Sequence, residues 1–265
     1  MKKFVKGVGI FFLILLILLV IFVIVLRVFA GKNNKVMYDT IADGLSAVRE
    51  EYTVRELDAG EYSDMRFYGI MKFHVDQYEV ENLGNLSVMT ADMGFMQMVS
   101  FMITPIEKNV PLCTLDYMYI LNNRKSYVEF YDLAGEQDTD AYRAVQASLQ
   151  EMTARWTEFE EIPAEAHWYD EYLKVLMHKK LSKDAEDRNK AMFLDALKTY
   201  LGESAKQDVS SAEVQAKQFE NTKAYSSGLI DKGGVSTDVF KKALGEDKTR
   251  DFFGKVFFGT AKYES

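Results

Sequence analysis

The sequence has few of the residues that build covalent or metal cross-links. Cys113 is the only cysteine among 265 residues, which excludes an intrachain disulfide and a thiolate-held zinc or iron–sulfur site. Three prolines and sixteen glycines, with 48% hydrophobic residues, are typical of a globular protein and not of a disordered or fibrous one. We also find no Walker loop, nucleophile elbow, HExxH motif or EF-hand loop.

An excess of positive charge is also lacking. The chain carries 40 acidic and 32 basic residues, which gives a formal net charge of −8. Residues 1–30 contain four basic residues and no acidic one, so removing their charge leaves −12 for residues 31–265. Because phosphate binding needs a basic face, we expect no nucleic-acid partner.

What the sequence does have is one long apolar run near its N-terminus. Gly7 to Leu26 is twenty residues without a charge, which is long enough for a helix to span the core of a bilayer. Val28-Phe29-Ala30 is a poor cleavage site, and Arg27 directly precedes it. We therefore interpret residues 1–30 as an uncleaved, single-pass signal anchor, with a cleaved signal peptide as the alternative.

The flanking charges leave the orientation of this anchor open. Three basic residues lie on each side of the apolar run: Lys2, Lys3 and Lys6 before it, and Arg27, Lys32 and Lys35 after it. The positive-inside rule compares the two flanks, and equal counts favour neither orientation.

Residues 31–265 are enough for one domain with a sizeable core. Apolar residues at helical spacing predict a first helix over residues 36–53. Alternating or apolar segments then predict strands over residues 67–78, 86–90, 96–104, 114–121 and 126–132. The short connections between these strands indicate an antiparallel meander, because parallel strands need long crossovers.

After residue 136 the pattern becomes helical. Helices are predicted over residues 139–159, 164–180, 186–201 and, more weakly, 205–230. A short helix capped by Ser236-Thr237 and ending at Gly245 follows, with a last helix over 247–257. Strands followed by helices predict an α+β fold, and a sheet apolar on both faces predicts helices on both. In this assignment His178 is a solvated cation near a helix end and His167 is a packing residue.

Polar residues inside the predicted strands are the candidates for chemistry. His74 and Asp76 lie two apart, so both side chains point to the same face of a strand. Asp116 interrupts the apolar strand Thr114–Met118, and a buried acid must be paired or protonated. If these faces are buried, the pKa values of such groups are perturbed and they can deliver protons. The alternative is that the strands show their polar faces to water.

The order of these motifs resembles the ferredoxin-dependent bilin reductases and the related red chlorophyll catabolite reductases. The resemblance covers roughly residues 64–258, and the order and spacing of its motifs carry more weight than any single one. The matching segments are Lys72-Phe73-His74-Val75-Asp76, Met98 to Pro105, Pro111 to Asp116, Glu129 to Leu133, Val239 to Glu246 and Phe252 to Phe258.

The resemblance implies an α/β/α sandwich in which a linear tetrapyrrole (a bilin) lies between the sheet and the C-terminal helices. Members of the family bind no metal or flavin, take single electrons from ferredoxin, and supply protons from side chains. By position, Asp116 matches the family's proton-donating sheet aspartate, Asp76 a carboxylic acid that is often glutamate, and His74 the histidine beside it. Ser100 occupies the place where some members have a second active-site histidine, so we expect it to contact substrate.

Three departures from the family pattern leave alternatives open. Gly234 falls where many members carry an aspartate, a membrane anchor is not typical, and the domain is acidic although ferredoxin prefers a basic docking face. The leading hypothesis is a membrane-anchored, bilin-reductase-like oxidoreductase, whose domain must face the cytoplasm if it uses ferredoxin. The alternatives are a non-enzymatic bilin- or haem-binding protein on the same fold, and a structural or interaction domain outside the cell.

Overall fold

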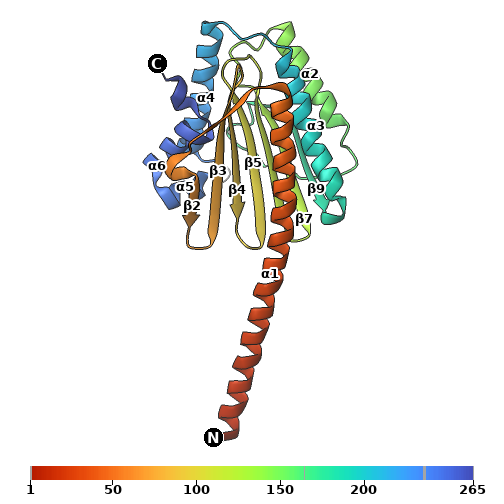
Figure 1. The fold of residues 1–265 in the computed structure, drawn as a ribbon, viewed down its shortest axis with the longest axis vertical. Coiled ribbons are helices and arrows are strands. Elements are labelled where there is room, and N and C mark those ends of the chain that lie inside the picture. The colour runs from red at the N-terminus through yellow and green to blue at the C-terminus, as the bar shows by residue number, and fades with distance from the viewer. Residues whose placement is uncertain (1, 164, 235–236, 265) are drawn as a thin grey trace.

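A computed structural model describes the backbone of residues 2–163, 165–234 and 237–264, and the side chains from residue 11 onward within these ranges. Its architecture is α+β: a large antiparallel sheet has helices on both faces, and a long helix projects from the domain (Figure 1). This confirms the predicted fold class as a helix-flanked antiparallel sheet.

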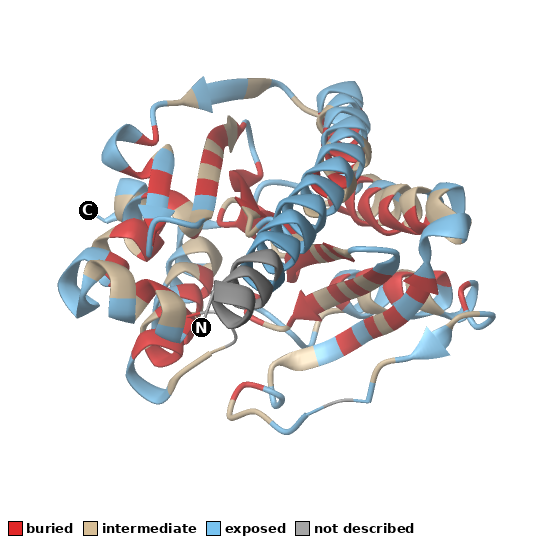
Figure 2. Cartoon of the chain, turned by 90° about the horizontal axis from the view of Figure 1, so that it is seen from below, coloured by how far each residue is buried: buried red, intermediate tan, exposed pale blue. Residues whose placement is uncertain are grey.

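The projecting helix, α1 (Lys2–Glu51), runs without a break through the predicted boundary at residue 30. Its second half packs on the sheet through Met37, Ile41 and Val48, as the helical spacing predicted. From Phe11 to Phe29 the helix is exposed or half-exposed, and Figure 2 shows this change along α1. By length and composition α1 is the one helix of the described residues that could cross a membrane.

In the described part of the chain the strands form one nine-stranded antiparallel sheet in the order β1-β3-β4-β5-β6-β7-β9-β8, with β2 also paired to β3. Their bounds are β1 Val54–Leu57, β2 Asp64–Phe67, β3 Met71–Val80, β4 Gly84–Asp92, β5 Met96–Pro105, β6 Leu112–Ile120, β7 Asn123–Tyr131, β8 Glu160–Glu161 and β9 Leu173–Ser182. The meander predicted from the short connections is β3 to β7. At its β3–β4 turn Asn82 has φ 60°, a left-handed conformation that asparagine tolerates.

The remaining helices lie in two groups, one on each side of the sheet. Their bounds are α2 Asp140–Ala154, α3 Glu186–Ala205, α4 Ala212–Lys232, α5 Thr237–Leu244 and α6 Glu246–Phe252; a π-helical turn, η3 (Phe253–Phe257), continues α6. Short 3-10 turns complete the elements: η1 Gly60–Tyr62, η2 Lys183–Ala185 and η4 Thr260–Tyr263. Thr139 caps α2 by accepting from the Tyr142 amide. The predicted cap Ser236 lies outside the described residues.

The helix predicted over 164–180 is wrong, because this segment ends in the sheet strand β9. Val175, Met177 and Leu181 of β9 are buried on one face of the strand. In the sequence, Leu173, Met177 and Leu181 recur every four residues, which also fits one face of a helix. β9 pairs with β7 along its length, so the sheet gains a strand after α2. Tertiary pairing therefore overrode the local pattern.

Two separate apolar cores lie on the two faces of the sheet. On one face Phe101 and Tyr117 pack edge-to-face against Phe193 of α3, beneath α1 and α2. On the other face Met98 and Met102 belong to a second core shared with α4, α5, α6 and η3. Successive side chains of a strand point to opposite faces, so one set of strands supplies both cores.

Candidate functional site

A cavity of about 570 Å³ lies between the sheet and the α4–η3 group of helices. The sheet contributes Ser100, Thr114, Asp116, Tyr127, Glu129 and His178 to its wall, together with several methionines. The helical side contributes mostly aromatic side chains: Tyr225, Phe240, Phe252, Phe253, Phe257 and Phe258. A mostly apolar cavity with a few convergent polar groups is the usual form of a site for a small organic ligand.

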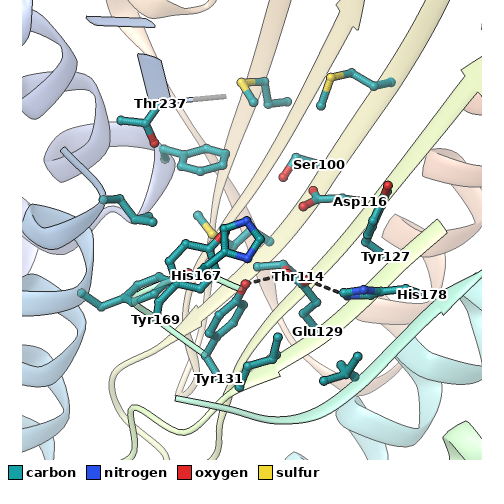
Figure 3. A pocket seen from close by; sticks show the side chains of 18 of the residues that line it. Ser100, Thr114, Asp116, Tyr127, Glu129, Tyr131, His167, Tyr169, His178 and Thr237 are labelled. Atoms are coloured by element: carbon teal, nitrogen blue, oxygen red, sulfur yellow. Dashed lines mark hydrogen bonds and ion pairs between the residues drawn. The ribbon is translucent and has the colours of Figure 1, made fainter. Parts of the chain in front are cut away.

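The polar groups form a row across four neighbouring strands. The register pairs Ser100 of β5 with Asp116 of β6, Asp116 with Tyr127 of β7, and Tyr127 with His178 of β9. Met89 of β4 pairs with Ser100 and extends the row on the other side. Because directly paired residues point to the same face, all five side chains line the cavity. Figure 3 labels the other four beside Met89: Ser100, Asp116, Tyr127 and His178.

Asp116 is the one carboxylic acid in this row of five residues. Its Oδ1 atom is fully buried and has no hydrogen-bond partner among the described residues. Burial raises the pKa of Asp116 to about 7; hydrogen bonding with Ser100 opposes this shift, and the negative charge of Glu129 adds to it. Near neutral pH this carboxyl therefore exists in both its protonated and its ionised form, as a proton donor requires.

A second group of titratable side chains stands beside Asp116. His178 Nε2 and Glu129 Oε1 are 2.7 Å apart, and the Tyr131 hydroxyl donates to Glu129 Oε2 at 2.6 Å (Figure 3). Both the histidine and the glutamate are largely buried. The cavity wall thus holds a hydrogen-bonded Tyr131–Glu129–His178 chain as well as the Asp116 carboxyl.

The aromatic wall opposite the sheet is held in place by polar side chains of β3 and β4. Gln77 Nε2 donates to the Lys255 carbonyl at 2.9 Å, and the Ser87 hydroxyl donates to the Phe257 carbonyl at 2.7 Å. Asn85 Nδ2 donates to the carbonyls of Val256 and Phe257. These bonds satisfy carbonyls of the π-helical turn η3, where the regular helical pattern is interrupted, and so position its phenylalanines.

The loop before β9 forms a further part of the cavity rim. His167 stacks on Tyr169 with ring centroids 4.8 Å apart, and both line the cavity. Trp168 between them donates from Nε1 to the Gly233 carbonyl at 2.7 Å. Its ring lies so close to Gly228 of α4 that a Cβ there would stand 2.4 Å from the indole. Glycine at 228 therefore lets the rim loop pack on α4.

The structure separates His74 and Asp76 from this cavity. The two side chains share a face, as predicted, and His74 Nε2 is 3.2 Å from Asp76 Oδ1, while Nδ1 is 3.0 Å from Asp64 Oδ1. Their neighbours Phe73 and Val75 belong to the core on the cavity side, so His74 and Asp76 point to the other face of β3. Of the four predicted site residues, Asp116 and Ser100 lie together in the cavity wall, whereas His74 and Asp76 contact each other outside it.

Sequence reasoning missed Glu129 and His178. The helical pattern of residues 164–180 puts His178 at a helix end, which hides its position in the strand β9. Glu129 lies in a strand that alternates polar and apolar residues, and such a pattern is typical of a face open to water. The sequence does show an acid in one segment and a histidine in another. They become neighbours only through the register of β7 and β9, so no local pattern connects them.

No arrangement for a metal ion is present in the described ranges. No group of three or more histidine, cysteine, aspartate or glutamate side chains there is placed to hold one. Cys113 is buried on the opposite core, and burial raises the pKa of its thiol. The polar groups of the cavity are instead suited to donating and accepting protons.

The fold is similar to that of a known enzyme. The crystal structure of phytochromobilin synthase from tomato in complex with biliverdin matches with a TM-score of 0.69 and 13% sequence identity, covering 85% of this chain and 83% of that one. No protein-family model and no curated protein matches the sequence. The resemblance inferred from motif order is therefore confirmed at the level of the fold: this chain has the fold of a ferredoxin-dependent bilin reductase.

Proposed function

We propose that this protein is a membrane-anchored, bilin-reductase-like oxidoreductase that reduces a linear tetrapyrrole. The observation that carries the proposal is the Asp116 carboxyl, with its pKa raised to about 7, in the wall of an aromatic cavity. The cavity lies between sheet and C-terminal helices, in a fold shared with an enzyme whose structure contains biliverdin. Its volume of about 570 Å³ falls within the range of sites for organic ligands of this kind.

Reduction of one double bond takes two electrons and two protons, and the protein side chains supply the protons. Asp116 donates the first, because its neutral form is populated near pH 7 and its Oδ1 atom has no competing partner among the described residues. Glu129 and His178 are the further proton-carrying groups of the same wall. Ser100 hydrogen-bonds with Asp116 and lowers its pKa, so it tunes the donor.

The electrons come from an external one-electron donor of the ferredoxin type, and no cofactor is bound. Residues 31–265 carry a net charge of −12, so an acidic donor needs a local basic face. Lys179 and Lys180 do not provide it, because they pair with Glu161 and Glu160 of β8. Use of a ferredoxin places the domain in the cytoplasm.

The anchor in this proposal is the exposed first half of α1, with residues 7–26 in the bilayer. The support is the length of this apolar segment and the exposed or half-exposed state of its described side chains, Phe11 to Leu26. A cleaved signal sequence has the same appearance, and N-terminal sequencing of the protein from membranes separates the two.

A non-enzymatic bilin- or haem-binding protein is the second candidate. It is favoured by the small set of proton donors, because Ser100 replaces a histidine found in some reductases and His74 and Asp76 do not reach the cavity. A carrier needs the aromatic cavity but not a carboxyl with a raised pKa.

The deciding experiment is a spectrophotometric titration of the full chain in detergent with biliverdin, followed by anaerobic addition of reduced ferredoxin. A pigment spectrum that shifts on binding and then changes with electron supply supports the reductase. A shift that does not change on electron supply favours the carrier, and a haem titration then tests the other ligand. Absence of any shift contradicts a bilin site.

A further inference from the structure

Four large apolar side chains are exposed at the turns of the sheet. Tyr68 is 63% exposed, Ile70 72%, Phe95 50% and Leu121 36%. They lie in the β2–β3, β4–β5 and β6–β7 connections. We refer to these four residues as the turn rim.

The turn rim gathers at one end of the sheet. β3 pairs Lys72 with Asp92 of β4, which places the turn containing Tyr68 and Ile70 at the same end as the β4–β5 turn. The Leu121 amide donates to the Phe95 carbonyl at 3.3 Å, which joins the third turn to the second. All three turns lie at the lower end of the domain in Figure 1.

α1 leaves the domain at this same end. Asn33 Nδ2 donates to the Leu121 carbonyl at 3.3 Å, and Asn34 Nδ2 donates to Asp92 Oδ2 at 3.2 Å. Ala30 is the first buried residue of α1 whose side chain is described, and the apolar segment before it projects away from the domain. Figure 2 looks onto this end, with α1 extending from it.

The distance along α1 places the turn rim close to a membrane. From Leu26, the last residue of the apolar run, to Asn33 is seven residues of an unbroken helix, or about 10 Å at the rise of an α-helix. The polar layer of a bilayer is about 5–8 Å thick on each side of the hydrocarbon core. Tyrosine and phenylalanine side chains at the edge of this layer gain from partial burial there.

We propose that the turn rim contacts the interfacial layer of the lipid bilayer, so that the domain stands on the membrane with this end of its sheet. The proposal rests on α1 being a membrane anchor, and it adds a second contact that sets the orientation of the domain. The apolar character of the rim and its continuity with the exposed segment of α1 identify the partner as lipid.

Site-directed spin labels on the full chain in lipid nanodiscs test this contact. Cys113 is buried and is the only native cysteine, so labels can be placed by Ile70→Cys and Phe95→Cys. Val209→Cys is the matched control, because Val209 is also an exposed apolar residue. It lies near the opposite end of the sheet: the amide of its neighbour Ser210 donates a hydrogen bond to the carbonyl of Glu107, which follows β5. Ile17→Cys reports on the anchor itself. The measurement is the accessibility of each label to oxygen relative to a water-soluble nickel complex.

We expect this ratio to be several-fold higher at positions 70 and 95 than at 209, and highest at 17. Phe95→Asp should lower the ratio at position 70, whereas Val209→Asp should leave it unchanged. A lipid signal at 17 with water-like values at 70 and 95 overturns the proposal and leaves the anchor intact. Water-like values at 17 as well overturn both. Protection at 70 and 95 that persists in detergent and depends on protein concentration indicates a second copy and also overturns it.

Discussion

The two faces of the sheet are built from the same strands but have different contents. The face beneath α1, α2 and α3 is filled with apolar side chains such as Phe101, Tyr117 and Phe193. The face toward α4, α5 and α6 keeps a cavity of about 570 Å³ and places Asp116 and Glu129 in its wall. A single set of strands can thus stabilise the domain on one face and tolerate costly buried acids on the other.

The largest effect on stability is expected on the filled face. Phe193→Ala removes a ring that packs against both Phe101 and Tyr117, and large-to-small changes of this kind cost about 3–5 kcal/mol. Urea unfolding of the full chain in detergent measures the loss. Biliverdin binding by the folded fraction should be retained. The matched change Phe257→Ala, on the cavity face, should reduce the free energy of unfolding less than Phe193→Ala does, and it should weaken biliverdin binding.

The next effect separates stability from function at Asp116. Its pKa is higher in the folded chain, about 7, than its ordinary value of 3.8, so the folded state binds more protons between these values and loses stability as pH rises through this window. Asp116→Asn removes this cost. The variant should gain unfolding free energy relative to the native chain from pH 5 to pH 8, by up to about 4 kcal/mol.

The same substitution should lower turnover of the proposed reductase by about 10²–10⁴-fold, because the proton donor is lost. Glu129→Gln is a companion variant: it removes a negative charge that raises the pKa of Asp116, so the apparent pKa of the pH–rate profile should fall. Unchanged turnover and pigment spectra in Asp116→Asn would remove Asp116 from the mechanism.

The smallest effect is expected at His74, which lies on the face of the sheet opposite to the cavity. Partial burial lowers its pKa, but the hydrogen bond to Asp64 and the charge of Asp76 outweigh this, and the net shift is upward. The associated stability is present below about pH 6.5 and lost as pH rises through the higher folded pKa. Because these groups are substantially exposed, His74→Gln should cost less than about 1 kcal/mol. A clear change in bound-pigment spectra would show that the two faces are coupled.

Much of the fold could be predicted because its signals are local. The meander from β3 to β7 follows from short turns between apolar segments, and the spacing of Met37, Ile41 and Val48 indicated the packed half of α1. β9 could not be recognised, because Leu173, Met177 and Leu181 recur every four residues, a spacing that fits one face of a helix as well as one face of a strand. Only pairing with β7 distinguishes the two.

The candidate site likewise contains residues that a local sequence signal identifies and residues that only tertiary pairing brings together. Asp116 could be found because an acid in the middle of an apolar strand is costly unless it has a purpose. His74 and Asp76 were correctly placed on one face of a strand, but the sequence does not say which face of the sheet holds the cavity. Glu129 and His178 are 49 residues apart, and the register of two non-consecutive strands brings them together.

The sequence by itself determined the apolar N-terminal segment, the antiparallel meander and the isolated acid at Asp116, since each depends on neighbouring residues and on the cost of burying charge. Only the tertiary structure decided which face carries the cavity, that β9 completes the sheet, and that the turn rim lies beside the exit of α1. These depend on pairings between distant segments. A one-residue change of register would turn every side chain of a strand to the other face, so they follow from packing as a whole.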